Sequence, residues 1–61
     1  MVKVKYLEKE HIFERKMTGQ RLLKELGLME EEVLLVRDGK IIPLDETVEG
    51  EVEIIPVISG G

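Results

Sequence analysis

The 61-residue sequence contains no cysteine and no tryptophan, and its aromatic residues are one tyrosine and one phenylalanine. Without cysteine the chain cannot form disulfide bonds or thiolate metal sites, and nothing marks an oxidising compartment. The longest apolar run, Ile54 to Ile58, is far too short to cross a membrane. The charged start, Met1 to Lys5, lacks the apolar core of a signal peptide. These absences predict a cytoplasmic protein that does not enter membranes.

Groups for enzymatic chemistry are also scarce. A domain of this size buries only about 60% of the surface that its unfolded chain exposes, so nearly every apolar residue is needed for the core and a deep pocket is not expected. The one serine, Ser59, and the one histidine, His11, are far apart in the sequence, which argues against a catalytic triad. We interpret His11 as a solvated turn residue, because a metal site needs two or three converging ligands. No catalytic residue and no metal site are predicted.

The charge is distributed unevenly along the chain. Residues 1–16 carry five basic and three acidic side chains, and residues 17–61 carry four basic and ten acidic ones, so net charges of +2 and −6 add to −4. An acidic chain with two aromatic residues lacks the basic stripe and the stacking rings of a nucleic-acid binder. We expect no binding to nucleic acid, and a charge-steered partner would be basic where it meets the C-terminal part.

The first third of the chain is predicted to form a hairpin. Residues 2–7 begin with alternating apolar and charged side chains, the period-two pattern of a strand with one wet face. A polar loop over residues 8–11 would lead into a second strand over residues 12–16. Two phases of this second strand are possible. The phase with Phe13 and Met17 inward is favoured over the opposite one because it buries more apolar surface.

A short amphipathic helix follows. Thr18 is a predicted N-cap, because its hydroxyl can accept a hydrogen bond from a free amide of the first turn. The leucines of the segment 20–26 have the spacing of one helix face, and polar residues occupy the other face. Gly27 suits the left-handed position that ends a helix, and Leu28 can pack back on Leu23 as in a Schellman motif.

The second half of the chain is predicted to contain three strands and little else. Asp38-Gly39 is typical of a type I′ hairpin turn, because that turn needs positive φ at both positions. The acidic run over residues 30–32 would form a solvated loop. A polar connection over residues 44–50 would cross to the last strand and contribute Leu44 and Val48 to the core. The predicted strands are residues 33–36, 40–42 and 51–55, the last ending where Pro56 removes a backbone donor.

The order of these elements predicts the fold. Five strands and one helix, which can cover one face of one sheet, indicate an α+β protein. The lysines of the first strand complement Glu51 and Glu53 of the last, so we place these two strands side by side at the centre. The result is a β-grasp fold, a mixed four- to five-stranded sheet with one helix packed on one face. Residues 1–56 would form the domain, and residues 57–61 a flexible C-terminal tail.

The most informative motif is the ending Gly60-Gly61. Two residues without side chains can lie extended in a channel too narrow for any other residue, and the carboxylate stays open to attack. A chain whose own C-terminus is the reactant needs such an ending. A frayed end or a cloning scar is the alternative explanation of the two glycines taken alone.

Three segments carry a resemblance to a known family: the Thr18-capped helix with the sequence QRLLKEL over residues 20–26, the hairpin RDGKIIP over residues 37–43, and the ending VISGG. Together with the order of elements they resemble the ThiS/MoaD family of ubiquitin-like sulfur carrier proteins. The resemblance implies that the Gly61 carboxylate is adenylated and then converted to a thiocarboxylate. It also implies that the preceding residues thread into the activating enzyme, namely Val57, Ile58, Ser59 and Gly60.

The same resemblance implies the partners. A ThiF/MoeB-type adenylating enzyme would supply ATP and magnesium, and this chain would bind no cofactor itself. The chain would be a carrier and a substrate, not an enzyme, and would pass sulfur to a synthase for thiamine or molybdopterin biosynthesis or to transfer RNA thiolation.

One surface residue and two other functions complete the predictions. If Val52 and Ile54 face the helix, Ile55 points to the opposite face and would mark a partner surface. The chain alone is expected to be a monomer. A ubiquitin-like modifier, joined through Gly61 to lysines of target proteins, is the main alternative function, because the same activation step serves both. A small adaptor domain with an inert tail is the third.

Overall fold

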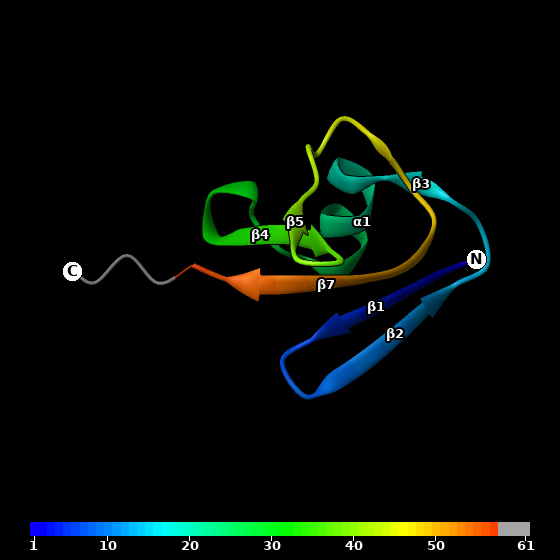
Figure 1. Cartoon of the computed structure of the whole chain (residues 1–61), viewed down its shortest axis with the longest axis horizontal. Coiled ribbons are helices and arrows are strands. Elements are labelled where there is room, and N and C mark those ends of the chain that lie inside the picture. The colour runs from blue at the N-terminus through cyan, green and yellow to red at the C-terminus, as the bar shows by residue number, and fades with distance from the viewer. Residues whose placement is uncertain (58–61) are drawn as a thin grey trace.

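Figure 1 shows the computed structural model of the chain, which describes residues 1–57. Within these residues the chain forms a five-stranded mixed sheet in the order β2-β1-β7-β4-β5, a small two-stranded sheet of β3 and β6, and one α-helix. The elements are β1 (Val2–Tyr6), β2 (Lys9–Phe13), β3 (Met17–Thr18), α1 (Gly19–Leu26), the 3-10 turn η1 (Glu30–Glu32), β4 (Val33–Arg37), β5 (Lys40–Ile41), β6 (Thr47–Val48) and β7 (Gly50–Pro56). The predicted β-grasp fold is confirmed.

The first and last strands form the centre of the sheet. β1 and β7 run parallel, with Lys3 opposite Glu51 and Lys5 opposite Glu53. The Lys3 ammonium lies 3.9 Å from the Glu51 carboxylate and 3.2 Å from that of Glu10 on β2. The predicted pairing of complementary charges across the two central strands is therefore confirmed.

Helix α1 begins and ends as its sequence predicts. The Arg21 amide donates a hydrogen bond of 3.2 Å to Thr18 Oγ1, so Thr18 is the N-cap. At the other end Gly27 has φ 73°. The Leu28 amide donates to the Leu23 carbonyl at 2.8 Å and the Gly27 amide to the Lys24 carbonyl at 3.1 Å, the two bonds of a Schellman motif.

The hydrophobic core lies between α1 and one face of the sheet. Its buried residues are Val2, Val4, Leu22, Leu23, Val33, Leu35, Ile42, Val48, Val52 and Ile54. Phe13 and Met17 pack against this core, whereas the Ile12 side chain is 62% exposed. The phase favoured for the second strand is thus confirmed.

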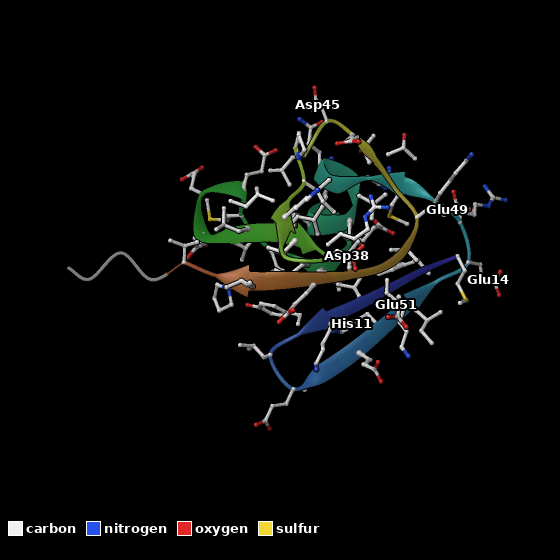
Figure 2. The ribbon with its side chains drawn as sticks, viewed as in Figure 1. His11, Glu14, Asp38, Asp45, Glu49 and Glu51 are labelled. Atoms are coloured by element: carbon white, nitrogen blue, oxygen red, sulfur yellow. The ribbon has the colours of Figure 1, made fainter. Side chains whose placement is uncertain are left out.

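The first hairpin is tighter than predicted. Tyr6 pairs with Lys9, so the loop contains only Leu7 and Glu8, and β2 begins three residues earlier than expected and ends at Phe13. Leu7 adopts φ 56°, which allows a two-residue connection but is uncommon for a residue with a side chain. His11, expected in the loop, instead lies half-buried within β2 opposite Val4 (Figure 2).

The second half also departs from the prediction in detail. Residues 44–50, predicted as an irregular connection, include the strand β6, in which Thr47 and Val48 pair with Thr18 and Met17 of β3. The acidic run over residues 30–32 is exposed as predicted, but it forms the 3-10 turn η1.

The second hairpin turns where the sequence predicts, at Asp38 (φ 51°) and Gly39 (φ 78°). Its second strand is shorter than expected, because β5 ends at Ile41. The next residue, Ile42, turns into the core, and its amide donates to the Leu35 carbonyl at 2.8 Å.

The start of α1 packs so closely that we expect Gly19→Ala to destabilise the fold. A Cβ atom at Gly19 would lie 3.0 Å from Leu35 Cδ2 and 3.1 Å from the backbone Cα of Leu44, which cannot easily move. Such overpacking costs about 1–3 kcal/mol, and each kcal/mol lowers the melting temperature of a domain this small by about 4–8 °C. Thermal unfolding followed by circular dichroism measures the shift. Gln20→Ala, at an exposed position of the same turn, is the control and should leave the melting temperature nearly unchanged.

Candidate functional site

Strand β7 carries the chain out of the centre of the sheet toward the predicted reactive ending (Figure 1). Its last pair with β4 is Pro56 opposite Val33. One residue further, the Val57 amide donates a hydrogen bond of 2.7 Å to the Glu32 carbonyl. Strand β7 ends at Pro56, one residue after the predicted range 51–55, and one backbone hydrogen bond to the β4 side follows at Val57.

The alternation of an antiparallel pair explains why proline is tolerated there. Val57 bonds toward the β4 side, so the backbone of the preceding residue, Pro56, is directed to the β1 side. β1 pairs with β7 only up to Tyr6, opposite Ile54. The donor that proline lacks would thus have no strand to bond to, and its absence costs the sheet nothing.

The β4 side of this contact changes shape at the same point. Glu30 to Glu32 form η1, in which the Glu32 amide donates to the Met29 carbonyl at 3.0 Å. A 3-10 turn directs its backbone groups into the turn and along its axis, so Glu30 and Glu31, unlike Glu32 at its end, do not present a strand edge toward β7. Within the described part of the chain, the Val57–Glu32 hydrogen bond is the last step of pairing along β7.

The face of the sheet opposite α1, which we call the open face, carries exposed aliphatic side chains beside this exit. Ile55 is 40% exposed and pairs with Leu34 of β4, which is 38% exposed. Val57 is 45% exposed. Ile54 is fully buried on the helix side, so the alternation of the strand places Ile55 on the open face. The sequence did not predict Leu34 as a neighbour of Ile55, because that position depends on the register between β4 and β7.

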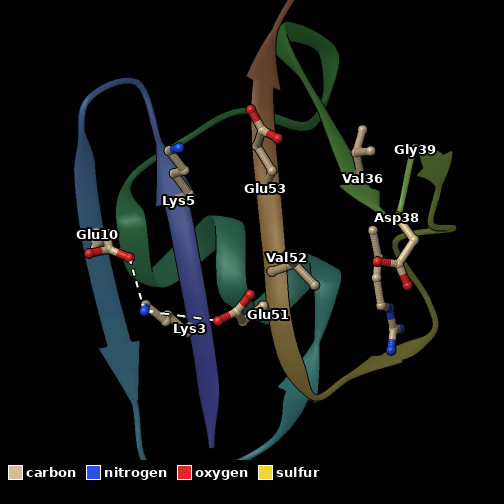
Figure 3. Close-up of a pocket in the computed structure, with 10 residues that line it drawn as sticks. Lys3, Lys5, Glu10, Val36, Asp38, Gly39, Glu51, Val52 and Glu53 are labelled. Atoms are coloured by element: carbon tan, nitrogen blue, oxygen red, sulfur yellow. Dashed lines mark ion pairs between the residues drawn. The ribbon is translucent and has the colours of Figure 1, made fainter.

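The rest of the open face is charged. A depression of about 340 Å³ lies there, and Figure 3 shows the side chains that line it. Three basic and four acidic side chains line it, together with Val36, Gly39 and Val52: Lys3, Lys5, Arg37, Glu10, Asp38, Glu51 and Glu53. Lys3 is paired with two of these carboxylates, Glu10 and Glu51, and the three basic and four acidic side chains differ by only one charge. This half of the face holds β2, β1 and β7 together and carries no excess charge of one sign strong enough to select a ligand.

Several predicted site residues cannot be placed. Ile58, Ser59, Gly60 and Gly61 lie outside the described residues. Among residues 1–57 no three histidine, cysteine, aspartate or glutamate side chains gather to hold a metal ion. No helix in the same range is long and apolar enough to cross a membrane.

Within residues 1–57 the sheet order and the one helix define a ubiquitin-like β-grasp protein. Comparison with known families is more specific: the ThiS family matches residues 2–61, and the chain belongs to this family. A protein of Archaeoglobus fulgidus, described as uncharacterized, is 42% identical over 79% of this chain and 78% of its own length. Members of the ThiS family are small carrier proteins, not enzymes, and they act with adenylating enzymes and sulfur acceptors.

Proposed function

We propose that this chain is a sulfur carrier whose reactive group is the carboxylate of Gly61. The observation that carries the proposal is the family match, which runs through the Gly60-Gly61 ending. The fold supports it, because the strand leading to this ending lies at the centre of the sheet and is held from both sides. The reactant is thus attached, through residues 57–60, to a strand that is paired on both sides.

The proposed chemistry has two steps. A Gly61 carboxylate oxygen attacks the α-phosphorus of ATP, pyrophosphate leaves, and an acyl adenylate forms. Hydrosulfide then attacks the carbonyl carbon, the carbon–oxygen bond to AMP breaks, and a thiocarboxylate remains. Adenylation is needed because a carboxylate oxygen is a poor leaving group until it becomes part of a mixed anhydride with a phosphate.

The activating partner would supply all the catalytic groups. We assign ATP and magnesium to a ThiF/MoeB-type adenylating enzyme, with no cofactor bound by this chain. The chain would contribute the threaded residues Ile58, Ser59 and Gly60, which follow Val57, and a docking surface around Ile55 and Leu34 beside the exit. A sulfur-accepting synthase of thiamine or molybdopterin biosynthesis, or of transfer RNA thiolation, would then consume the thiocarboxylate.

The mass of the intact protein tests this proposal. With its activating enzyme, ATP, magnesium and sulfide, the protein should gain the mass of one oxygen-to-sulfur exchange, located at Gly61 by fragmentation. The reaction without ATP is the control and should leave the mass unchanged. Conjugates that survive thiol reductant and leave Gly-Gly remnants on target lysines would favour the modifier instead. An unchanged C-terminus in native cell extract supplied with ATP would favour an inert adaptor.

A further inference from the structure

The last described contact of the chain suggests how the reactive ending is held. The Val57 amide donates to the Glu32 carbonyl at 2.7 Å, and the residues before Glu32 belong to the 3-10 turn η1 and not to a strand. We propose that this hydrogen bond is an anchor that sets the working length of the reactive ending at four residues, Ile58 to Gly61. The inference rests on the proposed function and adds to it a positioning residue.

The anchor limits how far the reacting group can be from the domain. Four residues, 58–61, span at most about 13–14 Å at 3.3–3.6 Å each. An enzyme that activates Gly61 must bring its nucleotide within this distance of Val57. The enzyme must therefore contact this end of the sheet, where the aliphatic side chains of Leu34 and Ile55 are exposed. The anchor thus couples the docking surface to the reacting carboxylate through a segment of fixed length.

Loss of the anchor should weaken productive binding and leave the chemical step intact. Without it the partner must order one more residue, and fixing one backbone residue lowers an association constant by about five- to thirtyfold. Proline at position 57 removes the N–H donor but also restricts φ, so the lower end of this range applies.

The first test compares Val57→Pro with Val57→Ala. Both variants lose the branched side chain, but only the alanine variant keeps the N–H, so their ratio reports on the hydrogen bond. We expect kcat/KM of ATP-dependent thiocarboxylate formation to be about fivefold lower for Val57→Pro than for Val57→Ala. The difference should lie in KM, with kcat alike. Equal values for the two variants would overturn the anchor.

The second test changes the length. One glycine inserted after Val57 keeps the anchor but displaces the carboxylate by up to about 3.5 Å. We expect kcat to fall at least about tenfold, because small displacements of a reacting group are costly. A fully active insertion variant would show that the enzyme positions the last residues whatever their distance from the Val57–Glu32 hydrogen bond. That result would contradict the inference.

Hydrogen–deuterium exchange tests the anchor without any enzyme. The Val57 amide should exchange slowly in the free protein, at a rate close to that of the Ile55 amide, because both bond toward the β4 side. Fast exchange at Val57 would overturn the anchor. If the Val57 amide is protected but the activating enzyme never adenylates the chain, the anchor stands and the proposed function is overturned.

Discussion

Removal of Gly60 and Gly61 should abolish ATP–pyrophosphate exchange with the activating enzyme while leaving the fold as stable as before. The core residues and the strand pairs described above all lie within residues 1–57, so the two glycines are not needed for them. We expect the melting temperature to stay within about 1 °C of the full-length value, because termini that are not tied into a sheet contribute little to stability. Thermal unfolding and isotope exchange into ATP measure the two effects separately.

The truncation removes the two glycines and also shifts the terminal carboxylate. A matched variant separates these two effects. Replacing both residues, Gly60→Ala and Gly61→Ala, keeps the chain length and the terminal carboxylate but adds two Cβ atoms. If the ending must enter a channel too narrow for side chains, this variant should also lose most exchange. Exchange by the truncated chain at the full-length rate would show that the reacting carboxylate is not that of Gly61.

Ile55→Asp should lower the affinity for the activating enzyme at least about tenfold, the effect of losing a well-packed interface residue. Ile55 lies beside Leu34 on the open face, next to the point where the chain leaves the sheet. The fold should survive, because the 40%-exposed side chain is not part of the buried core. Isothermal titration calorimetry with the enzyme gives the affinity, and urea unfolding of the free variant gives the stability.

Two further variants sharpen this experiment. Ile55→Lys should weaken binding as much as Ile55→Asp if the loss is one of apolar contact. A loss seen only with aspartate would indicate repulsion by an acidic group of the enzyme. Ile12→Asp is the matched control, because Ile12 is exposed on the open face at the far edge strand β2. An equal loss for Ile12→Asp, or unfolding of the Ile55 variants, would contradict the assigned surface.

Local patterns in the sequence were sufficient for most of the fold. The N-cap at Thr18, the Schellman ending at Gly27 and the turn at Asp38-Gly39 depend on neighbouring residues, and all three are confirmed. The central pair of β1 and β7 followed from complementary charges on Lys3 and Glu51.

The features that sequence reasoning missed depend on residues far apart in the chain. The two-residue loop needs Leu7 at positive φ, which no local preference of leucine predicts. The pairing of β3 with β6 involves two residues on each side, too few to give a periodic pattern. At the candidate site, Ile55 was placed by strand alternation alone, whereas the Val57–Glu32 contact depends on the register between β7 and β4.

The position of β7 between β1 and β4 also has a consequence for biosynthesis. During translation the β1–β2 hairpin, the helix and the β4–β5 hairpin leave the ribosome before β7, so the sheet stays in two halves with unpaired inner edges. Only insertion of β7 joins them, and pairing between distant segments folds slowly. A chain that stops short of this strand remains unfolded and open to proteases. A stable domain therefore forms only after the strand that leads to the reactive ending has been synthesised, and chains that lack this strand are degraded.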